Sequence, residues 1–132
     1  MEKCIFCEIV RGLVPSYKLY EDFHSMAFLD IFPTTKGQCL VIPKVHTSSS
    51  FSEAPLDILQ ETLAVTHTLA KQIEEKLDAE RSFILIQGLG VAHLHIKIFP
   101  AFKGGAETID TIGPNKPEDQ TILTAVQKEI LT

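Results

Sequence analysis

Two short motifs in the sequence carry side chains that could do chemistry. His93 and His95 are two residues apart, so on a strand both imidazole rings would project to the same side and lie close together. Such a pair suits shared chemistry, although two buried, hydrogen-bonded histidines would show the same spacing. Cys4 and Cys7 form a Cys-x-x-Cys pair, which occurs in metal sites, in redox pairs and by chance.

The elements that must position these side chains follow from apolar periodicity and from breakers. We expect a short helix at 4–11, a β-hairpin made of 18–21 and 25–29, a turn at 33–37, a buried strand at 39–42, a long helix from about 52 to 77, strands at 83–86 and 91–99, a loop at 103–105, and a C-terminal helix at 117–131. Ser52 or a neighbour could cap the long helix, and Pro55 suits its first turn. The apolar stripe of the long helix contains Leu56, Leu59, Leu63, Ala70, Ile73 and Leu77, and that of the last helix contains Ile122, Leu123, Val126 and Ile130. The pattern predicts a single α+β domain over residues 1–132.

Composition and charge narrow the classes of function. A chain of 132 residues with 45% hydrophobic residues can fill one core. The formal net charge of -5 offers no basic stripe for long nucleic acid, whereas a small phosphorylated ligand can still bind in a local pocket. Without an apolar signal core or a run long enough to span a membrane, we expect a cytoplasmic protein. Its three cysteines should then stay reduced, which favours metal binding by the close pair over a disulfide framework.

Residues 91–100, Val-Ala-His-Leu-His-Ile-Lys-Ile-Phe-Pro, resemble the histidine triad motif, in which histidines alternate with apolar residues before a proline. Other segments follow the order and spacing of the same family, namely 4–12, 15–16, 20–22, 27–31, Gly37 and 40–46. The resemblance covers roughly residues 4–102 and is to the zinc-containing bacterial and archaeal branch of the histidine triad family. Residues 103–132 lie outside it.

This resemblance implies a five-stranded antiparallel sheet with helices packed on it, paired with a second copy in a two-fold dimer. It also implies cleavage at the α-phosphate of a bound purine nucleotide, as in adenosine phosphoramidates or dinucleoside polyphosphates, through a covalent nucleotidyl-histidine. By position His95 would be that nucleophile. A neutral imidazole suits the task because it attacks phosphorus readily, provided that its other nitrogen is held as a donor, commonly by a backbone carbonyl.

A structural zinc site is implied as well, with Cys4, Cys7, His46 and His93 as ligands. Two thiolates and two imidazoles complete a tetrahedral zinc ion and leave no open position. Such a site would tie the N-terminus and the loop at His46 to the segment that bears His95.

The implied nucleotide pocket begins at Asp30, whose carboxylate could accept hydrogen bonds from both ribose hydroxyls, although it could also be an ordinary turn aspartate. Backbone amides of Gly88, Leu89 and Gly90 would cradle the α-phosphate, since glycine allows close approach. The apolar clamp on the purine would be made of residues that could equally be ordinary core, namely Ile5, Phe6, Ile9, Leu29 and Ile31.

Several positions depart from the family pattern. Lys97 stands where the third histidine is expected, Gln38 replaces the upstream histidine, Leu89 replaces a glutamine, and the loop before the triad is short. Lys97 could clamp a phosphate but is a poorer proton donor than histidine, and Gln38 can hydrogen-bond but not exchange a proton. Two hypotheses follow: a nucleotide hydrolase or transferase in which Lys97 stabilises the phosphate, and a nucleotide-binding protein with slow or no turnover. A purely structural zinc module would leave His95 and Asp30 unexplained.

Overall fold

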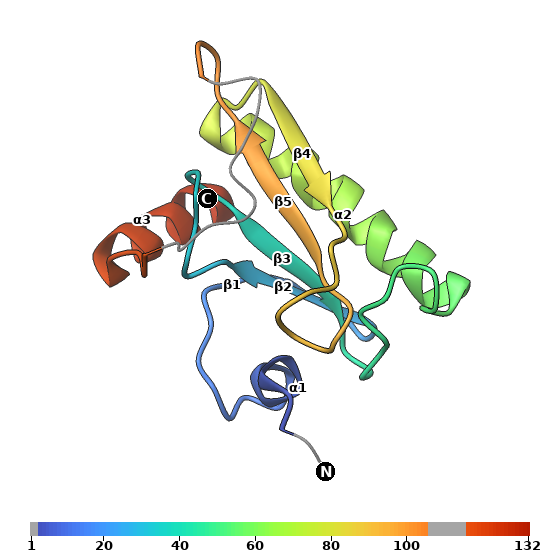
Figure 1. Ribbon diagram of the computed structural model, residues 1–132. Coiled ribbons are helices and arrows are strands. Elements are labelled where there is room, and N and C mark those ends of the chain that lie inside the picture. Colours follow the sequence, from blue (N-terminus) through green and yellow to red (C-terminus); the bar gives the residue numbers. More distant parts are fainter. Residues whose placement is uncertain (1–2, 106–115) are drawn as a thin grey trace.

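The computed structural model describes residues 3–105 and 116–132. Five strands form one antiparallel sheet in the order β1-β2-β3-β5-β4 (Figure 1). The strands are β1 (Lys18–Glu21), β2 (Ser25–Leu29), β3 (Cys39–Pro43), β4 (Arg81–Leu85) and β5 (Ile96–Ala101), and the helices are α1 (Ile5–Val10), α2 (Leu56–Leu77) and α3 (Gln120–Leu131). The expected α+β class, with one long helix and two short ones on a five-stranded antiparallel sheet, is confirmed.

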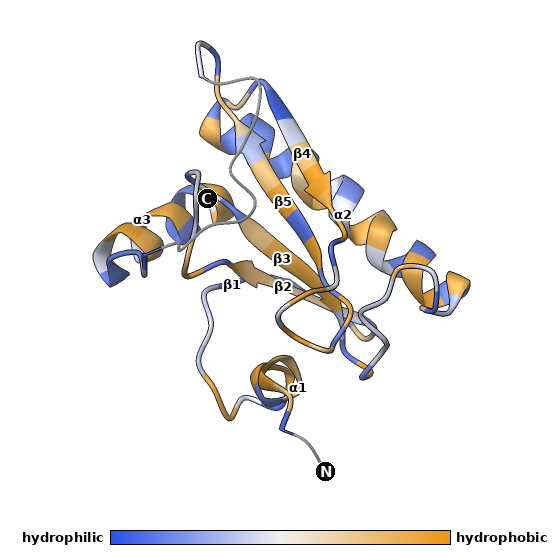
Figure 2. Ribbon diagram, viewed as in Figure 1, coloured by the Kyte–Doolittle hydropathy of each residue, from blue (hydrophilic) through white to orange (hydrophobic). Residues whose placement is uncertain are grey.

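The two central strands β2 and β3 are buried along their whole length, and β3 is apolar throughout (Figure 2). Because successive side chains point to opposite faces, these strands feed two separate cores. One core lies under α2 and α3 and includes Ala27, Leu29, Cys39, Val41, Ile73, Leu123, Val126 and Ile130. The other lies under α1 and consists of Phe6, Ile9, Met26, Phe28, Leu40 and Ile42. The sheet therefore has a face covered by two helices and a face covered only by short α1.

The buried stripe of α2 differs from the expected one. Leu59, Ala70, Ile73 and Leu77 are buried as expected. Leu56 and Leu63, however, are 66% and 45% exposed, and Thr62 and Thr66 take the interior positions. Each threonine can be buried because its hydroxyl donates to the carbonyl four residues earlier, at 2.8 Å in both cases.

Helices α2 and α3 both begin later in the chain than expected. Pro55 is the N-cap of α2 without a side-chain hydrogen bond, so the expectation of a cap at Ser52 is wrong. Pro55 has an extended ψ of 131°, which ends the preceding loop and lets the helix begin at Leu56. Helix α3 begins at Gln120 rather than near 117, because Asp119 is its cap and accepts a 2.7 Å hydrogen bond from the Thr121 amide.

Strand β5 begins five residues later than the sequence pattern predicts. Residues 91–95 form bends and irregular backbone, so His93 and His95 do not lie on a strand. The β3–β5 ladder stops at the pair Val41 and Ile96 because Pro43, further along β3, has no amide hydrogen to donate. The Leu94 amide donates instead to the Thr47 carbonyl at 2.9 Å, which draws this segment toward the loop after β3.

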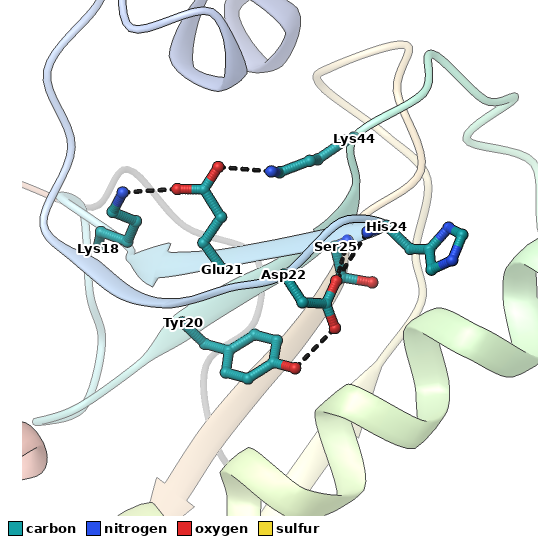
Figure 3. Close-up of polar contacts among 7 residues, drawn as sticks. All are labelled: Lys18, Tyr20, Glu21, Asp22, His24, Ser25 and Lys44. Atoms are coloured by element: carbon teal, nitrogen blue, oxygen red, sulfur yellow. Dashed lines mark hydrogen bonds and ion pairs between the residues drawn. The ribbon is translucent and has the colours of Figure 1, made fainter.

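Polar contacts fix the β1–β2 hairpin, which has the bounds expected from the sequence. The Asp22 carboxylate accepts hydrogen bonds from the backbone amides of His24 and Ser25 at 2.8 and 2.7 Å, and from the Tyr20 hydroxyl at 2.6 Å (Figure 3). These bonds, the Tyr20 contact foremost, lower the pKa of Asp22. A single carboxylate thus closes the three-residue turn.

A separate ion-pair network joins β1 to the residue after β3. Glu21 contacts the Lys18 ammonium at 2.6 Å and the Lys44 ammonium at 2.5 Å (Figure 3). Lys18 and then Lys44 lower the pKa of Glu21 to about 2.

The C-terminal helix completes the larger core. Leu123, Val126 and Ile130 are buried against α2 and the sheet, while Ile122, expected on the same side, is 49% exposed. The Gln127 side chain also donates to the Lys18 carbonyl at 2.9 Å. The expected loop is described only at 103–105, and 106–115 lie outside the described residues. None of the helices in the described ranges combines the length and apolar character needed to cross a membrane.

Candidate metal and nucleotide sites

Four side chains from three separate segments of the sequence meet beside the N-terminus of α1. Cys4, Cys7, His46 and His93 place their ligand atoms within 4.8 Å of one another. The Cys4 Sγ and His93 Nδ1 atoms are 3.3 Å apart, and Cys7 Sγ lies 3.3 Å from His46 Nδ1 and 3.5 Å from His93 Nδ1. A tetrahedral zinc ion, with bonds of about 2.3 Å to sulfur and about 2.0 Å to nitrogen, holds such atoms about 3.5 Å apart. The donor set therefore fits a closed zinc site.

Local structure explains how these ligands converge. Cys4 is the N-cap of α1 and Cys7 lies one turn later, so both thiols are on the same side of the helix, and the Cys7 amide donates to Cys4 Sγ at 3.4 Å. His46 follows β3, and His93 lies in the bent segment before β5. A metal ion here would connect α1 to both of those segments.

Hydrogen bonding prepares His93 as a ligand. Its Nε2–H donates to the Pro43 carbonyl at 2.8 Å, so Nδ1, the atom that faces the thiols, carries the lone pair. Burial lowers the pKa of His93, which favours the neutral ring that a metal requires. Burial, followed by the neighbouring Cys4, raises the pKa of the Cys7 thiol. A cation between the two sulfur atoms would remove that penalty on the thiolate.

His95 is 3% exposed and lies against α1. Its Nδ1–H donates to the His93 carbonyl at 2.7 Å, which leaves the lone pair on Nε2. The Phe6 ring meets the His95 ring edge to face, with ring centres 5.4 Å apart. Burial lowers the pKa of His95, and the charge of Lys97 lowers it further, against the opposing effects of the His93 carbonyl and Asp30. Burial and the Nδ1–H bond therefore both favour a neutral imidazole with its lone pair on Nε2.

Lys97, Asp30 and Gln38 share a face of the sheet. Lys97 pairs with Leu40 of β3, and Leu40 belongs to the core under α1. Gln38 is two residues before Leu40, and the Asp30 amide donates to the Gln38 carbonyl at 2.9 Å, which continues the β2–β3 ladder by one pair. All three side chains therefore belong to the face covered by α1.

The apolar residues expected to clamp a purine do not all come together. Phe6 and Ile9 of α1 are buried, and the Phe6 ring contacts both His93 and His95. Ile5 and Ile31 are 42% and 46% exposed. Leu29 is 2% exposed and lies in the other core, beneath α2 and α3. The structure thus brings Phe6 to His95, keeps Ile9 in the core under α1 and places Leu29 on the opposite face of the sheet.

Phe28 was missed by the sequence reasoning. It is 3% exposed, and its ring meets Phe6 edge to face with centres 5.6 Å apart. Strand alternation could have identified it, because Phe28 and Asp30 are two residues apart on the same side of the hairpin.

Gly88 and Gly90, in the loop before His93, are required for different structural reasons. Gly88 has a φ of +75°, and a Cβ there would lie 2.3 Å from the Ser49 carbonyl oxygen, while the Ser49 hydroxyl donates to the Gly88 carbonyl at 2.9 Å. Gly90 has a φ of +89° with open space around it, and Leu89 between them is 68% exposed. Gly88 is therefore needed for docking on the loop after β3, and Gly90 for its backbone conformation.

Two hollows lie near these residues. A groove of about 970 Å³ runs between α1 and residues 90–92 and is bordered by Cys4, Cys7 and His46. A cavity of about 150 Å³ lies between Asp30, Gln38, the turn at 33–37 and the start of α3. His95 lines neither hollow.

The chain thus combines a five-stranded antiparallel sheet with a Cys/His cluster beside a buried histidine. The family model described as "HIT domain" matches residues 11–104. "Protein hit" of Bacillus subtilis is 35% identical over 139 residues, covering 98% of this chain and 95% of that protein. An adenosine 5'-monophosphoramidase of Saccharomyces cerevisiae is 37% identical over 103 residues, which cover 74% of this chain and 61% of the yeast protein. A crystal structure of a Zn-bound histidine triad family protein from Mycobacterium smegmatis matches with a TM-score of 0.74 and 29% identity. The match covers 97% of this chain and 95% of the mycobacterial chain. The chain belongs to the HIT domain family.

Proposed function

We propose that this protein is a nucleotide hydrolase or transferase that acts at the α-phosphate of adenosine phosphoramidates or dinucleoside polyphosphates. The observation that carries the proposal is the hydrogen bond from His95 Nδ1–H to the His93 carbonyl at 2.7 Å, which leaves Nε2 as a neutral nucleophile. Its 37% identity to the yeast adenosine 5'-monophosphoramidase supports chemistry of this class.

In the first step the Nε2 lone pair of His95 attacks the α-phosphorus. An Nε2–P bond forms as the bond from phosphorus to the leaving group breaks. The leaving group keeps the electron pair and takes up a proton from solvent. Water then attacks phosphorus, the Nε2–P electrons return to the ring, and the proton of the attacking water passes to solvent. The Nδ1–H bond to the His93 carbonyl persists throughout and shares the positive charge that the ring acquires.

Other residues bind and orient the nucleotide. We assign to Lys97 the role of a fixed positive charge that contacts the phosphate, and to Asp30 the role of acceptor for the ribose hydroxyls. We assign the α-phosphate to the backbone amides of Gly88, Leu89 and Gly90, and the purine to Phe6 and Ile9 with partly exposed Ile5 and Ile31. Leu29 can support this proposed purine site only from the opposite face of the sheet.

Cys4, Cys7, His46 and His93 would hold a zinc ion. When bound it supplies a structural link and no chemistry, since the four ligands fill a tetrahedron. The link would keep Phe6 of α1 against His95.

We further propose that the protein acts as a homodimer in the cytoplasm. Strand β4 is an edge of the sheet, and its Ile84 is 45% exposed. An unpaired edge with an exposed apolar side chain suits strand pairing with a second copy.

Release of AMP from adenosine phosphoramidate and from a diadenosine polyphosphate tests the proposal. Wild type should turn over, His95→Ala should not, and His67→Ala, at an exposed histidine of α2, should match wild type. If wild type binds AMP but releases none from either substrate, the second hypothesis, a nucleotide-binding protein without turnover, replaces the first. The substitution of the third histidine by Lys97 is the observation that favours that alternative.

A further inference from the structure

Gln38 is an amide side chain that is 2% exposed, and all of its polar atoms are paired. Its Nε2 donates to Asp30 Oδ2 at 2.9 Å. Its Oε1 accepts from the Thr34 backbone amide at 2.7 Å and from the Thr34 hydroxyl at 3.0 Å. The chemistry of the partners fixes this orientation, since a carboxylate can only accept and a backbone amide can only donate.

The same network fixes the Asp30 carboxylate. Asp30 Oδ1 accepts from the Phe32 amide at 2.9 Å, so among the described residues each carboxylate oxygen is held by one donor. A carboxylate oxygen can accept two hydrogen bonds, and each therefore keeps one acceptor position for a ligand. Two adjacent acceptors in a fixed plane are suited to the two neighbouring hydroxyls of a ribose.

Gln38 itself is poorly placed to touch a phosphate. Its amide nitrogen donates to Asp30 and its carbonyl accepts from Thr34, and rotation toward a ligand would break both links and leave the partly buried Thr34 amide without this acceptor. Its contribution to ligand binding therefore passes through Asp30.

We propose that Gln38 is a positioning residue that sets Asp30 for the 2'- and 3'-hydroxyls of a nucleotide and thereby selects ribonucleotides. This inference rests on the proposed function, because it assumes that Asp30 meets the ribose. It assigns Gln38 a role in ribose selection rather than in proton transfer or phosphate binding.

The test compares AMP with 2',3'-dideoxy-AMP by isothermal titration calorimetry on the full zinc-loaded chain. Gln38→Glu retains the acceptor for Thr34, removes the amide donor to Asp30 and adds a like charge against that carboxylate. Gln38→Met removes both links at similar size and serves as the second variant if the first misfolds. Thr34→Val removes one contact to Gln38 and leaves the Asp30 link intact, which makes it the matched control.

Gln38→Glu should weaken AMP binding about tenfold, as expected for loss of a hydrogen bond to a charged group. It should leave the affinity for the dideoxy nucleotide within about twofold of wild type, and Thr34→Val should keep the preference for AMP. In an Asp30→Ala background, Gln38→Met should have no further effect on AMP.

Equal losses for the two nucleotides, or no loss for either, would overturn the inference. If Asp30→Ala alone leaves AMP affinity unchanged, the inference fails while the role proposed for His95 stands. A wild-type protein that binds neither nucleotide would refute the proposed function, and the inference with it.

Discussion

Helix α1 should separate from the sheet when the metal is removed. Fixing the backbone of its six residues costs roughly 6–12 kcal/mol at about 1–2 kcal/mol per residue. Burial of its two core side chains, Phe6 and Ile9, returns about 3–6 kcal/mol. Central values leave a deficit of about 4 kcal/mol, which structural zinc can cover because it contributes about 10 kcal/mol or more in small zinc-dependent domains.

Hydrogen–deuterium exchange of the segment 3–14 measures this dependence. With zinc bound, a net stabilisation of about 6 kcal/mol should protect the α1 amides about 10^4-fold, because 1.4 kcal/mol corresponds to a factor of ten, and a strong chelator should remove that protection. Amides of β3 should change far less. Cys4→Ser should mimic the chelator, whereas Cys39→Ala, at a buried cysteine on the other face, should retain one zinc per chain. Unchanged α1 protection in protein shown to be metal-free would refute the reasoning.

Two further predictions concern the loops and the hairpin. Gly88→Ala should destabilise the fold by about 3 kcal/mol, because it combines a left-handed φ with a clash against the Ser49 carbonyl, whereas Gly90→Ala should cost about 1–2 kcal/mol for the φ alone. Equal melting temperatures of the two variants in thermal unfolding would contradict this explanation. For Glu21 the folded pKa of about 2 lies below its ordinary value of 4.5, so its stabilising effect is complete above about pH 4.5 and is lost as pH falls toward 2. The melting temperatures of wild type and Glu21→Gln should therefore converge as the pH falls from 5 to about 2. A constant difference would show that the pairing of Glu21 with Lys18 and Lys44 does not contribute to stability.

Local patterns were enough to predict most of the fold. The β1–β2 hairpin, with Asp22 in its turn, and strand β3, with its continuous apolar run, were predicted to within a residue. Both signals lie within the elements themselves: turn-forming residues mark the hairpin, and an unbroken apolar run marks a strand buried on both faces. Helix α2 was predicted from its apolar periodicity, but its full set of buried residues was not. Thr62 and Thr66 can be interior residues only because their hydroxyls donate to backbone carbonyls of the same helix.

The four residues of the metal cluster were predicted as a group, but the geometry around the two histidines was not. The alternation around His93 and His95 indicated a strand, and only the pairing with β3 reveals that Pro43 ends the ladder before them. The ligand set of the metal came from family resemblance, since spacing alone left the Cys-x-x-Cys pair ambiguous. The link from Gln38 to Asp30 depends on the register of β2 against β3, which no local pattern encodes.

The central claim is that His95 carries the nucleotidyl group. Wild type mixed with adenosine phosphoramidate and quenched in alkali, where phosphorus–nitrogen bonds survive, should show by intact-protein mass spectrometry a population heavier by one adenylyl group. Peptide mapping should place the group on His95, and His95→Ala should never acquire it. Turnover in the wild type that continues in His95→Ala, or an adduct mapped to another residue, would contradict the account.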